Sequence, residues 1–133
     1  MAETALSIAR EKAAARGIGA DFVAADALHL ERLGRVFDTV LDCGLFHTFD
    51  SDERREYVAS LAAVTGRGGN LYVLSFSDTG RGACGPHPIS QEQLRVPFER
   101  SGAWRVASID PDRIQTRFAA DGAPAWLAKI ERI

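Results

Sequence analysis

The most reactive and polar side chains of this sequence gather in one short stretch, residues 37–49. An apolar run from Val36 to Asp42 is typical of a buried strand, and it ends on an acid. Small residues and then an aromatic and imidazole cluster follow that acid: Cys43, Gly44, Phe46, His47 and Phe49. Because ligands of open α/β sheets bind just beyond the carboxyl ends of the strands, this stretch predicts a binding site.

Two side chains of this stretch could take part in catalysis. Cys43 would need a neighbouring base to become a nucleophile. We favour the alternative that Cys43 is a small residue which lets a bound ligand lie close to the backbone. His47 is the candidate catalytic base if a proton must be removed, although a pocket wall or a structural histidine is the favoured interpretation. Phe46 fits a ligand contact and a core residue equally well. The three histidines are too scattered to predict a metal site.

Length and composition limit the class of protein. The 133 residues suit a single domain, 1–133, with a substantial core. A formal net charge of −2 gives no reason to expect nucleic acid or an anionic membrane as a partner. No apolar run is long enough to span a membrane, and the N-terminus lacks the pattern of a signal peptide. The two cysteines suggest reduced thiols, so we expect a cytoplasmic protein.

The rest of the chain alternates helices with strands, which indicates a parallel sheet covered by helices. A helix beginning near Thr4 leads to a short apolar strand at 21–26. Capping-box patterns at 50–53 and 90–93 predict the starts of two more helices, and Pro97 is expected to kink or shorten the second.

The end of the chain has a different pattern. After a strand expected at 71–76, two β-rich runs follow at Trp104–Ile109 and Trp126–Ile133. Asp121-Gly122 lies between these runs and is a turn signal. The two runs therefore predict an antiparallel pair at the far edge of the sheet.

One apparent cofactor motif is discounted. Residues 80–85 match G-x-G-x-x-G literally. That fingerprint binds phosphates only where a strand turns directly into a helix. Here prolines flank His87, and the next helix start is at Ser90, so a dinucleotide site in this loop is not expected.

The order of the elements resembles the class I S-adenosylmethionine-dependent methyltransferases, of the small-molecule, thiopurine-methyltransferase-like sort. Segments 3–10, 25–28, 37–49 and 66–77 carry the resemblance. They look like the helix after the family's second strand, the turn after its third strand, the fourth strand with its loop, and the fifth strand. The resemblance implies an α/β, Rossmann-like methyltransferase sheet, mostly parallel with an antiparallel C-terminal edge, that is missing its first two strands.

The resemblance also implies roles for particular residues. Asp26 matches the acid that binds the adenine amino group, with Ala27 and Leu28 beside the ring; a turn cap is the alternative role for Asp26. The expected contacts of the methionine end are Asp42, Cys43 and Gly44. Phe46 and His47 would then lie near a small-molecule methyl acceptor.

The family's glycine-rich turn and the acid that ends its second strand have no match in this sequence. Met1 falls just after the place of that acid, so we expect a chain shortened at its N-terminus that binds S-adenosylmethionine weakly and transfers a methyl group slowly or not at all. The alternatives are a non-catalytic remnant that acts as an interaction domain, and a nucleotide-binding α/β protein without methyl transfer.

A prediction about assembly follows from the same resemblance. In the family the first strand pairs with the fourth, so the Phe37–Asp42 strand would have an open edge. Open apolar edges invite pairing. Either the strand at 21–26 pairs there, or two chains associate; we favour a homodimer through this edge.

Overall fold

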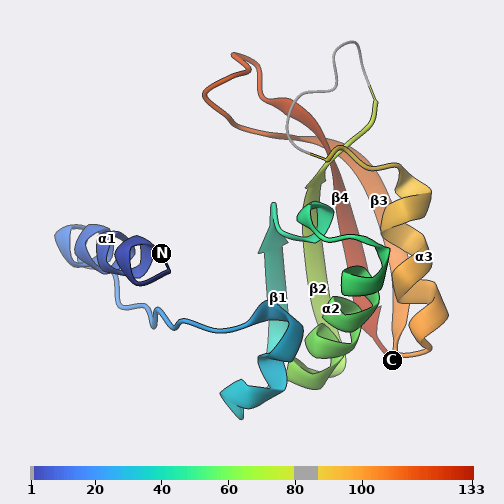
Figure 1. Ribbon diagram of the computed structural model, residues 1–133, viewed down its shortest axis with the longest axis horizontal. Coiled ribbons are helices and arrows are strands. Elements are labelled where there is room, and N and C mark those ends of the chain that lie inside the picture. Colours follow the sequence, from blue (N-terminus) through green and yellow to red (C-terminus); the bar gives the residue numbers. More distant parts are fainter. Residues whose placement is uncertain (1, 80–86) are drawn as a thin grey trace.

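The computed structural model describes residues 2–79 and 87–133, and these residues form a mixed sheet of four strands in the order β1–β2–β4–β3 (Figure 1). The strands are β1 (Phe37–Cys43), β2 (Thr65–Phe76), β3 (Trp104–Ile114) and β4 (Ala123–Arg132). β1 runs parallel to β2, whereas β4 is antiparallel to both β2 and β3. The carboxyl ends of β1 and β2 therefore lie at the same edge of the sheet.

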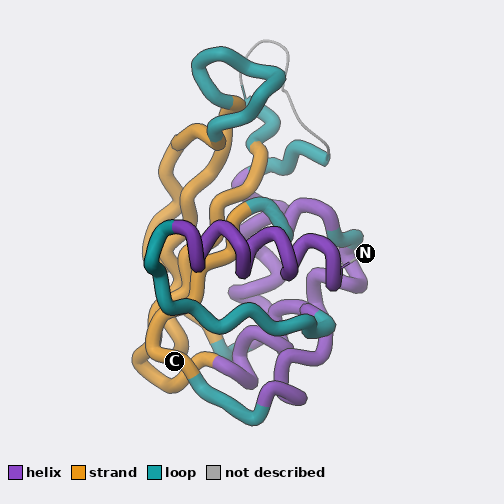
Figure 2. Tube along the Cα trace, turned by 90° about the vertical axis from the view of Figure 1, so that its left-hand side faces the viewer, coloured by secondary structure: helices purple, strands orange, loops and turns teal. Residues whose placement is uncertain are grey.

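Two helices cover one face of this sheet, α2 (Ser51–Val64) and α3 (Gln91–Ser101) (Figure 1). Figure 2 shows the strands on one side of the molecule and these helices on the other. The covered face is apolar because Leu71 and Val73 of β2 lie opposite Ile130 and Ala128 of β4, and side chains alternate along a strand. These residues form the core with others from the helices and their flanks: Phe46, Tyr57, Val58, Leu61, Leu94, Phe98 and Trp104.

Both helices begin as the sequence predicts. The Asp50 carboxylate accepts from the Glu53 amide at 2.9 Å, and Ser90 Oγ accepts from the Gln93 amide at 3.1 Å. Reciprocal bonds complete both capping boxes. α3 continues past Pro97 to Ser101, so Pro97 does not end the helix; the alternative expectation of a kink stays a prediction.

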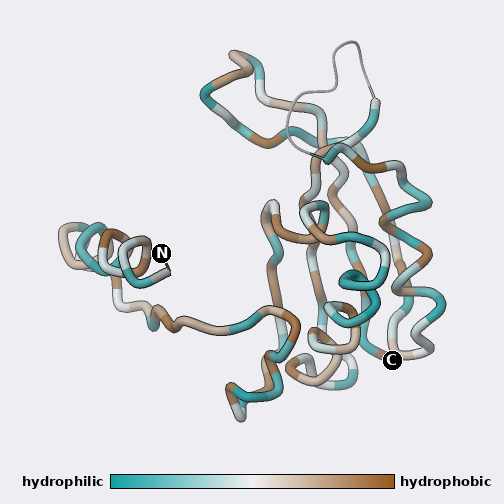
Figure 3. The backbone as a smooth tube through the Cα atoms, viewed as in Figure 1, coloured by the Kyte–Doolittle hydropathy of each residue, from teal (hydrophilic) through white to brown (hydrophobic). Residues whose placement is uncertain are grey.

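The strand expected at 21–26 is also wrong, because this stretch pairs with no other strand of the described chain. Apolar composition favours a strand only where a neighbour can bond its backbone groups. Here the Phe22 carbonyl accepts instead from Arg10 of the helix α1 (Ala2–Ala15) at 2.9 Å. Figure 3 shows the brown, apolar part of this stretch away from the sheet, in accord with the exposed Val23.

The sheet is consequently mixed and not mostly parallel, since only the β1–β2 ladder is parallel among its three ladders. The expected antiparallel C-terminal edge is confirmed, with β3 outermost. β2 begins earlier than predicted, at Thr65. The G-x-G-x-x-G match at 80–85 lies outside the described residues. Among the described residues, no helix has both the length and the apolar character that crossing a membrane requires.

Candidate functional site

The carboxylate of Asp42 organises the carboxyl end of β1. It is 4% exposed, and both of its oxygens accept hydrogen bonds from the protein. Oδ1 accepts from the Leu45 amide at 2.9 Å, and Oδ2 accepts from the Phe46 amide at 3.0 Å. Oδ2 also accepts from the Tyr57 hydroxyl of α2 at 2.8 Å. One side chain thus closes the turn after β1 and fastens it to α2.

Burial and hydrogen bonding shift the pKa of the Asp42 carboxyl in opposite directions. Burial raises the pKa of the Asp42 carboxyl, whereas hydrogen bonds from Leu45, Tyr57 and Phe46 oppose the rise. Burial and the neighbouring Asp42 charge together raise the pKa of the Tyr57 hydroxyl, which stays protonated and able to donate. Three donors on two oxygens suit the ionised carboxylate, which can only accept.

Cys43 and Gly44 follow Asp42 in this turn, with Cys43 exposed and Gly44 half-buried. The Gly44 amide donates to the Leu74 carbonyl of β2 at 2.9 Å. Gly44 has φ +84°, a left-handed conformation that disfavours any other residue. The Asp42 carboxylate faces the core, so it holds the turn from inside and leaves Cys43 and the Gly44 backbone on the outer side.

The ring of Phe46 lies in the core. It is fully buried, stacks on Phe98 with centroids 5.6 Å apart, and has the Arg54 guanidinium 5.2 Å from its centroid. The acceptor contact predicted for Phe46 is therefore corrected to a core role. The sequence could not decide between these two roles, because the short 3₁₀ turn η2 (Phe46–Thr48) has no periodicity that would indicate its buried side.

His47 is buried beside the end of β2. It is 2% exposed, its Nδ1 accepts from the Phe76 amide at 3.3 Å, and the two rings lie 4.8 Å apart. Burial, and next the charges of His87 and Arg54, lower the pKa of His47. A neutral imidazole that accepts at Nδ1 carries its proton on Nε2.

Asp26 lies just before the 3₁₀ segment η1 (Ala27–Leu33), which packs against α2. Its exposed carboxylate accepts from the Leu28 amide at 2.9 Å, which is the capping role that the sequence offered as an alternative. A carboxylate has further lone pairs, so this bond fixes its orientation without using its whole capacity to accept.

Sequence reasoning missed Ser60 of α2, which holds η1 in place. Ser60 Oγ donates to the Ala27 carbonyl at 2.7 Å and accepts from the Leu30 amide at 2.8 Å. The available signal was a serine within the buried face of a helix, where a polar group needs partners. α2 therefore positions both Asp26, through η1, and the turn after β1.

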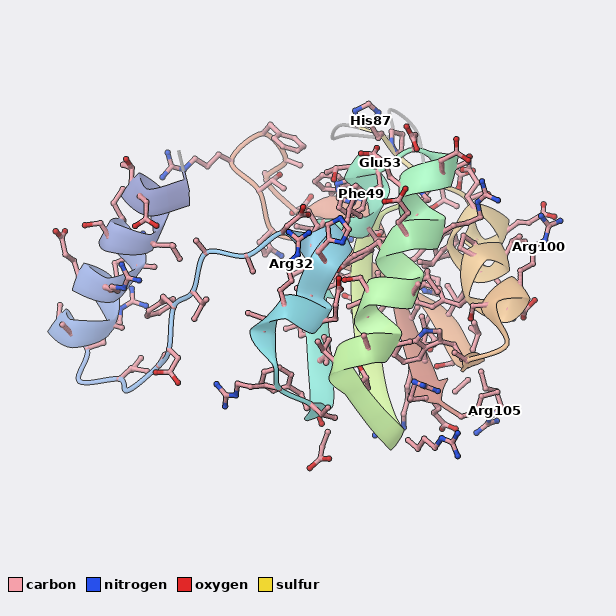
Figure 4. All side chains as sticks on the ribbon, turned by 60° about the horizontal axis from the view of Figure 1, so that its bottom comes forward. Arg32, Phe49, Glu53, His87, Arg100 and Arg105 are labelled. Atoms are coloured by element: carbon pink, nitrogen blue, oxygen red, sulfur yellow. The ribbon has the colours of Figure 1, made fainter. Side chains whose placement is uncertain are left out.

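His87 is a second residue that sequence reasoning left without a role. Its side chain is exposed, and its φ of 54° is left-handed although it is not glycine. Figure 4 shows it at the same end of the molecule as Phe49 and Glu53. Non-glycine residues with left-handed backbone conformations are concentrated at active sites and ligand-binding sites. The sequence signal was a histidine flanked by prolines in the loop after β2.

Hollows open on the described surface. One of about 390 Å³ is lined by Thr79, Pro111, Asp112, Arg113, Pro124 and Ala125. Another, of about 470 Å³, lies between α2 and α3 and includes Arg54 and Arg100. Neither lining includes Asp26, Cys43 or Gly44; the first two residues are exposed and Gly44 is half-buried. Within residues 2–79 and 87–133, no group of three or more His, Cys, Asp or Glu side chains could hold a metal ion.

Comparisons with known proteins agree with this arrangement. A family model described as a methyltransferase domain matches residues 1–69. The 2-heptyl-1-hydroxyquinolin-4(1H)-one methyltransferase of Mycobacteroides abscessus is 32% identical over 116 residues, covering 85% of this chain and 50% of that protein. The demethylmenaquinone methyltransferase of Thermus thermophilus is 39% identical over 126 residues, covering 92% of this chain and 56% of that protein.

A solved structure from work on the conversion of a disulfide bond into a thioacetal group during echinomycin biosynthesis matches with a TM-score of 0.84 at 36% identity. The match covers 97% of this chain and 62% of that one. The chain thus belongs to the methyltransferase domain family, and S-adenosylmethionine is the cofactor of that class I family. The predicted resemblance and the Rossmann-like fold class are confirmed. The chain spans about half the length of the curated relatives it matches, 50% and 56%.

The bond from Tyr57 to Asp42 yields a prediction about stability. Tyr57→Phe removes one donor from a buried carboxylate, so we expect the free energy of unfolding to fall by about 2 kcal/mol at neutral pH. The pKa of Asp42 is already raised, and losing this bond raises it further. Because the bond matters most to the ionised form, the loss should shrink as the pH falls and Asp42 becomes protonated.

Urea unfolding at several pH values measures this loss. Tyr72→Phe is the matched control, because Tyr72 is half-buried and makes no side-chain hydrogen bond with the described residues. Equal, pH-independent losses in the two variants would count against the assigned role of Tyr57.

The environment of His47 yields a second prediction. Its pKa should lie below the ordinary 6.5, and the neutral ring should carry its proton on Nε2. A lowered pKa means that the stabilising effect of neutral His47 is complete above pH 6.5 and is lost as the pH falls through the pKa of the folded protein. Nitrogen-15 NMR of the imidazole reports both quantities. A pKa above 6.5, or a proton on Nδ1, would overturn the hydrogen bond to the Phe76 amide.

Proposed function

We propose that this chain contributes the adenine-contacting and methionine-contacting surfaces of an S-adenosylmethionine-dependent methyltransferase for a small-molecule acceptor. The observation that carries the proposal is the turn at Cys43 and Gly44, held outward at the carboxyl end of a parallel strand by the buried Asp42 carboxylate. Ligands of open α/β sheets bind at this position. The family match supports the same cofactor.

The residues present fit the cofactor in chemical terms. Asp26 offers an exposed, acceptor-only carboxylate whose orientation is fixed by the Leu28 amide, which suits the exocyclic amino group of adenine. Ala27 and Leu28 would flank the ring. At the other surface, Gly44 has no side chain to obstruct the approach of a ligand to the backbone. The cofactor, when bound, would supply an activated methyl group.

The chain's own residues would then hold and align the acceptor, since methyl transfer depends mainly on proximity and alignment. Nδ1 of His47 is occupied by the Phe76 amide and its ring is buried. Accepting a proton at Nδ1 would break that bond. We therefore propose that His47 supports the acceptor site from inside the protein, through its bond to the Phe76 amide, in preference to catalysis as a base. The named acceptors of the M. abscessus and T. thermophilus relatives are small molecules, which supports an acceptor of this size.

The open edge of β1 supports a second candidate, a non-catalytic interaction domain that pairs with another copy of the chain. Leu41 of this edge strand is 68% exposed, and such an edge is a template for pairing. A homodimer through β1 and a cytoplasmic location stay predictions. Sedimentation across micromolar concentrations tests the dimer, because the interaction domain requires a self-associating chain.

Calorimetry with S-adenosylmethionine, S-adenosylhomocysteine and ATP tests the proposal directly. We expect this 133-residue chain to bind the first two in preference to ATP, but weakly. The family's contacts to the ribose hydroxyls have no counterpart in the described residues. Two or three such bonds at about 0.5–1.5 kcal/mol each correspond to one to three orders of magnitude in affinity.

Asp26→Asn sharpens this test because asparagine still caps η1 but loses the purely accepting carboxylate. We expect a further weakening of about fivefold. Asp21→Asn is the matched control, since Asp21 is an exposed acid in the same stretch. Preferred binding of ATP would favour a nucleotide-binding protein without methyl transfer. Equal effects of the two substitutions would refute the adenine contact.

A further inference from the structure

Phe118 is an aromatic side chain left largely exposed at the end of the sheet where the cofactor is proposed to bind. It lies in the loop 115–122 between β3 and β4 and is 59% exposed. Among the large apolar residues that are exposed in the described chain, it is the aromatic one. Single exposed apolar side chains are common on protein surfaces, so the position of this ring and its contacts carry the argument that follows.

The ring of Phe118 is not isolated. Its centroid lies 6.2 Å from that of Phe76, at an interplanar angle of 55°. Phe76 is the last residue of β2 and is itself nearly buried. Phe118 therefore rests against a fixed ring and still presents much of its surface outward.

A series of contacts links Phe118 to the turn after β1. The Phe76 ring lies 4.8 Å from the His47 ring, and Cε1 of His47 lies 3.9 Å from where a Cβ of Gly44 would stand. The sequence of neighbours is thus Gly44, His47, Phe76 and Phe118. Figures 1 and 2 both show the β3–β4 loop beyond the carboxyl end of β2.

A hollow of about 390 Å³ lies at this end of the sheet. Its lining includes Ala125, which is the ladder partner of Phe76, and Thr79, which follows β2, although the rings themselves are not part of that lining. That volume lies in the range of pockets that bind small molecules. The lining of this hollow is mixed, because Pro111, Pro124 and Ala125 are apolar whereas Thr79, Asp112 and Arg113 are polar or charged.

We propose that Phe118 forms one wall of the methyl-acceptor subsite and that the acceptor is a planar, apolar aromatic ring system packed against it. This inference rests on the proposed function, because the subsite adjoins the turn assigned to the methionine end of the cofactor. Aromatic rings prefer offset or edge-to-face contacts with other rings, which a saturated ring of the same size cannot make. Phe118 would favour planar acceptors over saturated ones. Phe76, which packs against His47, would hold the Phe118 ring in position.

Binding of 1-naphthol and of its saturated counterpart decahydro-1-naphthol, measured by ligand-observed NMR, tests this proposal. We expect the chain to bind 1-naphthol about fivefold more tightly than the saturated alcohol. Phe118→Leu should abolish this preference, and Phe118→Tyr should retain it. Ile133→Leu is the matched control, because Ile133 is 56% exposed at the C-terminus, away from this loop in Figure 1.

The outcomes separate this inference from the proposed function when S-adenosylhomocysteine is titrated into the same samples. Binding of S-adenosylhomocysteine without saturable binding of 1-naphthol would overturn the aromatic subsite alone. An unchanged preference in Phe118→Leu would overturn it as well. Phe118-dependent binding of 1-naphthol without S-adenosylhomocysteine binding would support the subsite and count against the cofactor assignment. Circular dichroism of each variant checks that the fold is intact.

Discussion

The buried carboxylate of Asp42 is the constraint on which the rest of the site depends. A carboxylate that is 4% exposed is costly unless its oxygens are hydrogen-bonded, and here two turn amides and the Tyr57 hydroxyl supply those bonds. The same bonds hold the outer part of the turn, at Cys43 and Gly44, in a single arrangement. Core stability and site geometry therefore depend on one side chain.

Helix α2 holds both the turn after β1 and the segment η1, which follows Asp26. Tyr57 and Ser60 lie three positions apart, on one face of the helix. Tyr57 bonds Asp42 at the end of β1, whereas Ser60 bonds the backbone of η1, which follows Asp26. A single rigid helix thus sets the positions of the surfaces assigned to the two ends of the cofactor, although the surfaces come from separate segments of the chain.

The sequence predicted those features that depend on local chemistry. Both capping boxes and the acid-to-glycine turn at 42–44 follow from residues close in sequence, and the structure contains them. The stretch 21–26 has the composition of a strand, but it pairs with no strand of the described sheet. Strand pairing depends on residues far along the chain, so local composition does not predict it. The burial of Phe46 and the bonds of Ser60 depend on how α2 and α3 pack, which no local pattern encodes. His87 and Phe118 lie in loops, where periodicity gives no information.

The central claim is that η1 and the turn after β1 together form the cofactor surface. Amide chemical-shift mapping of the nitrogen-15-labelled chain with S-adenosylhomocysteine tests it most directly, because the method detects binding even at millimolar affinity. We predict saturable shifts that centre on Ala27, Leu28, Cys43 and Gly44. Shifts confined to the hollow between α2 and α3, or no saturable shifts at all, would contradict the claim.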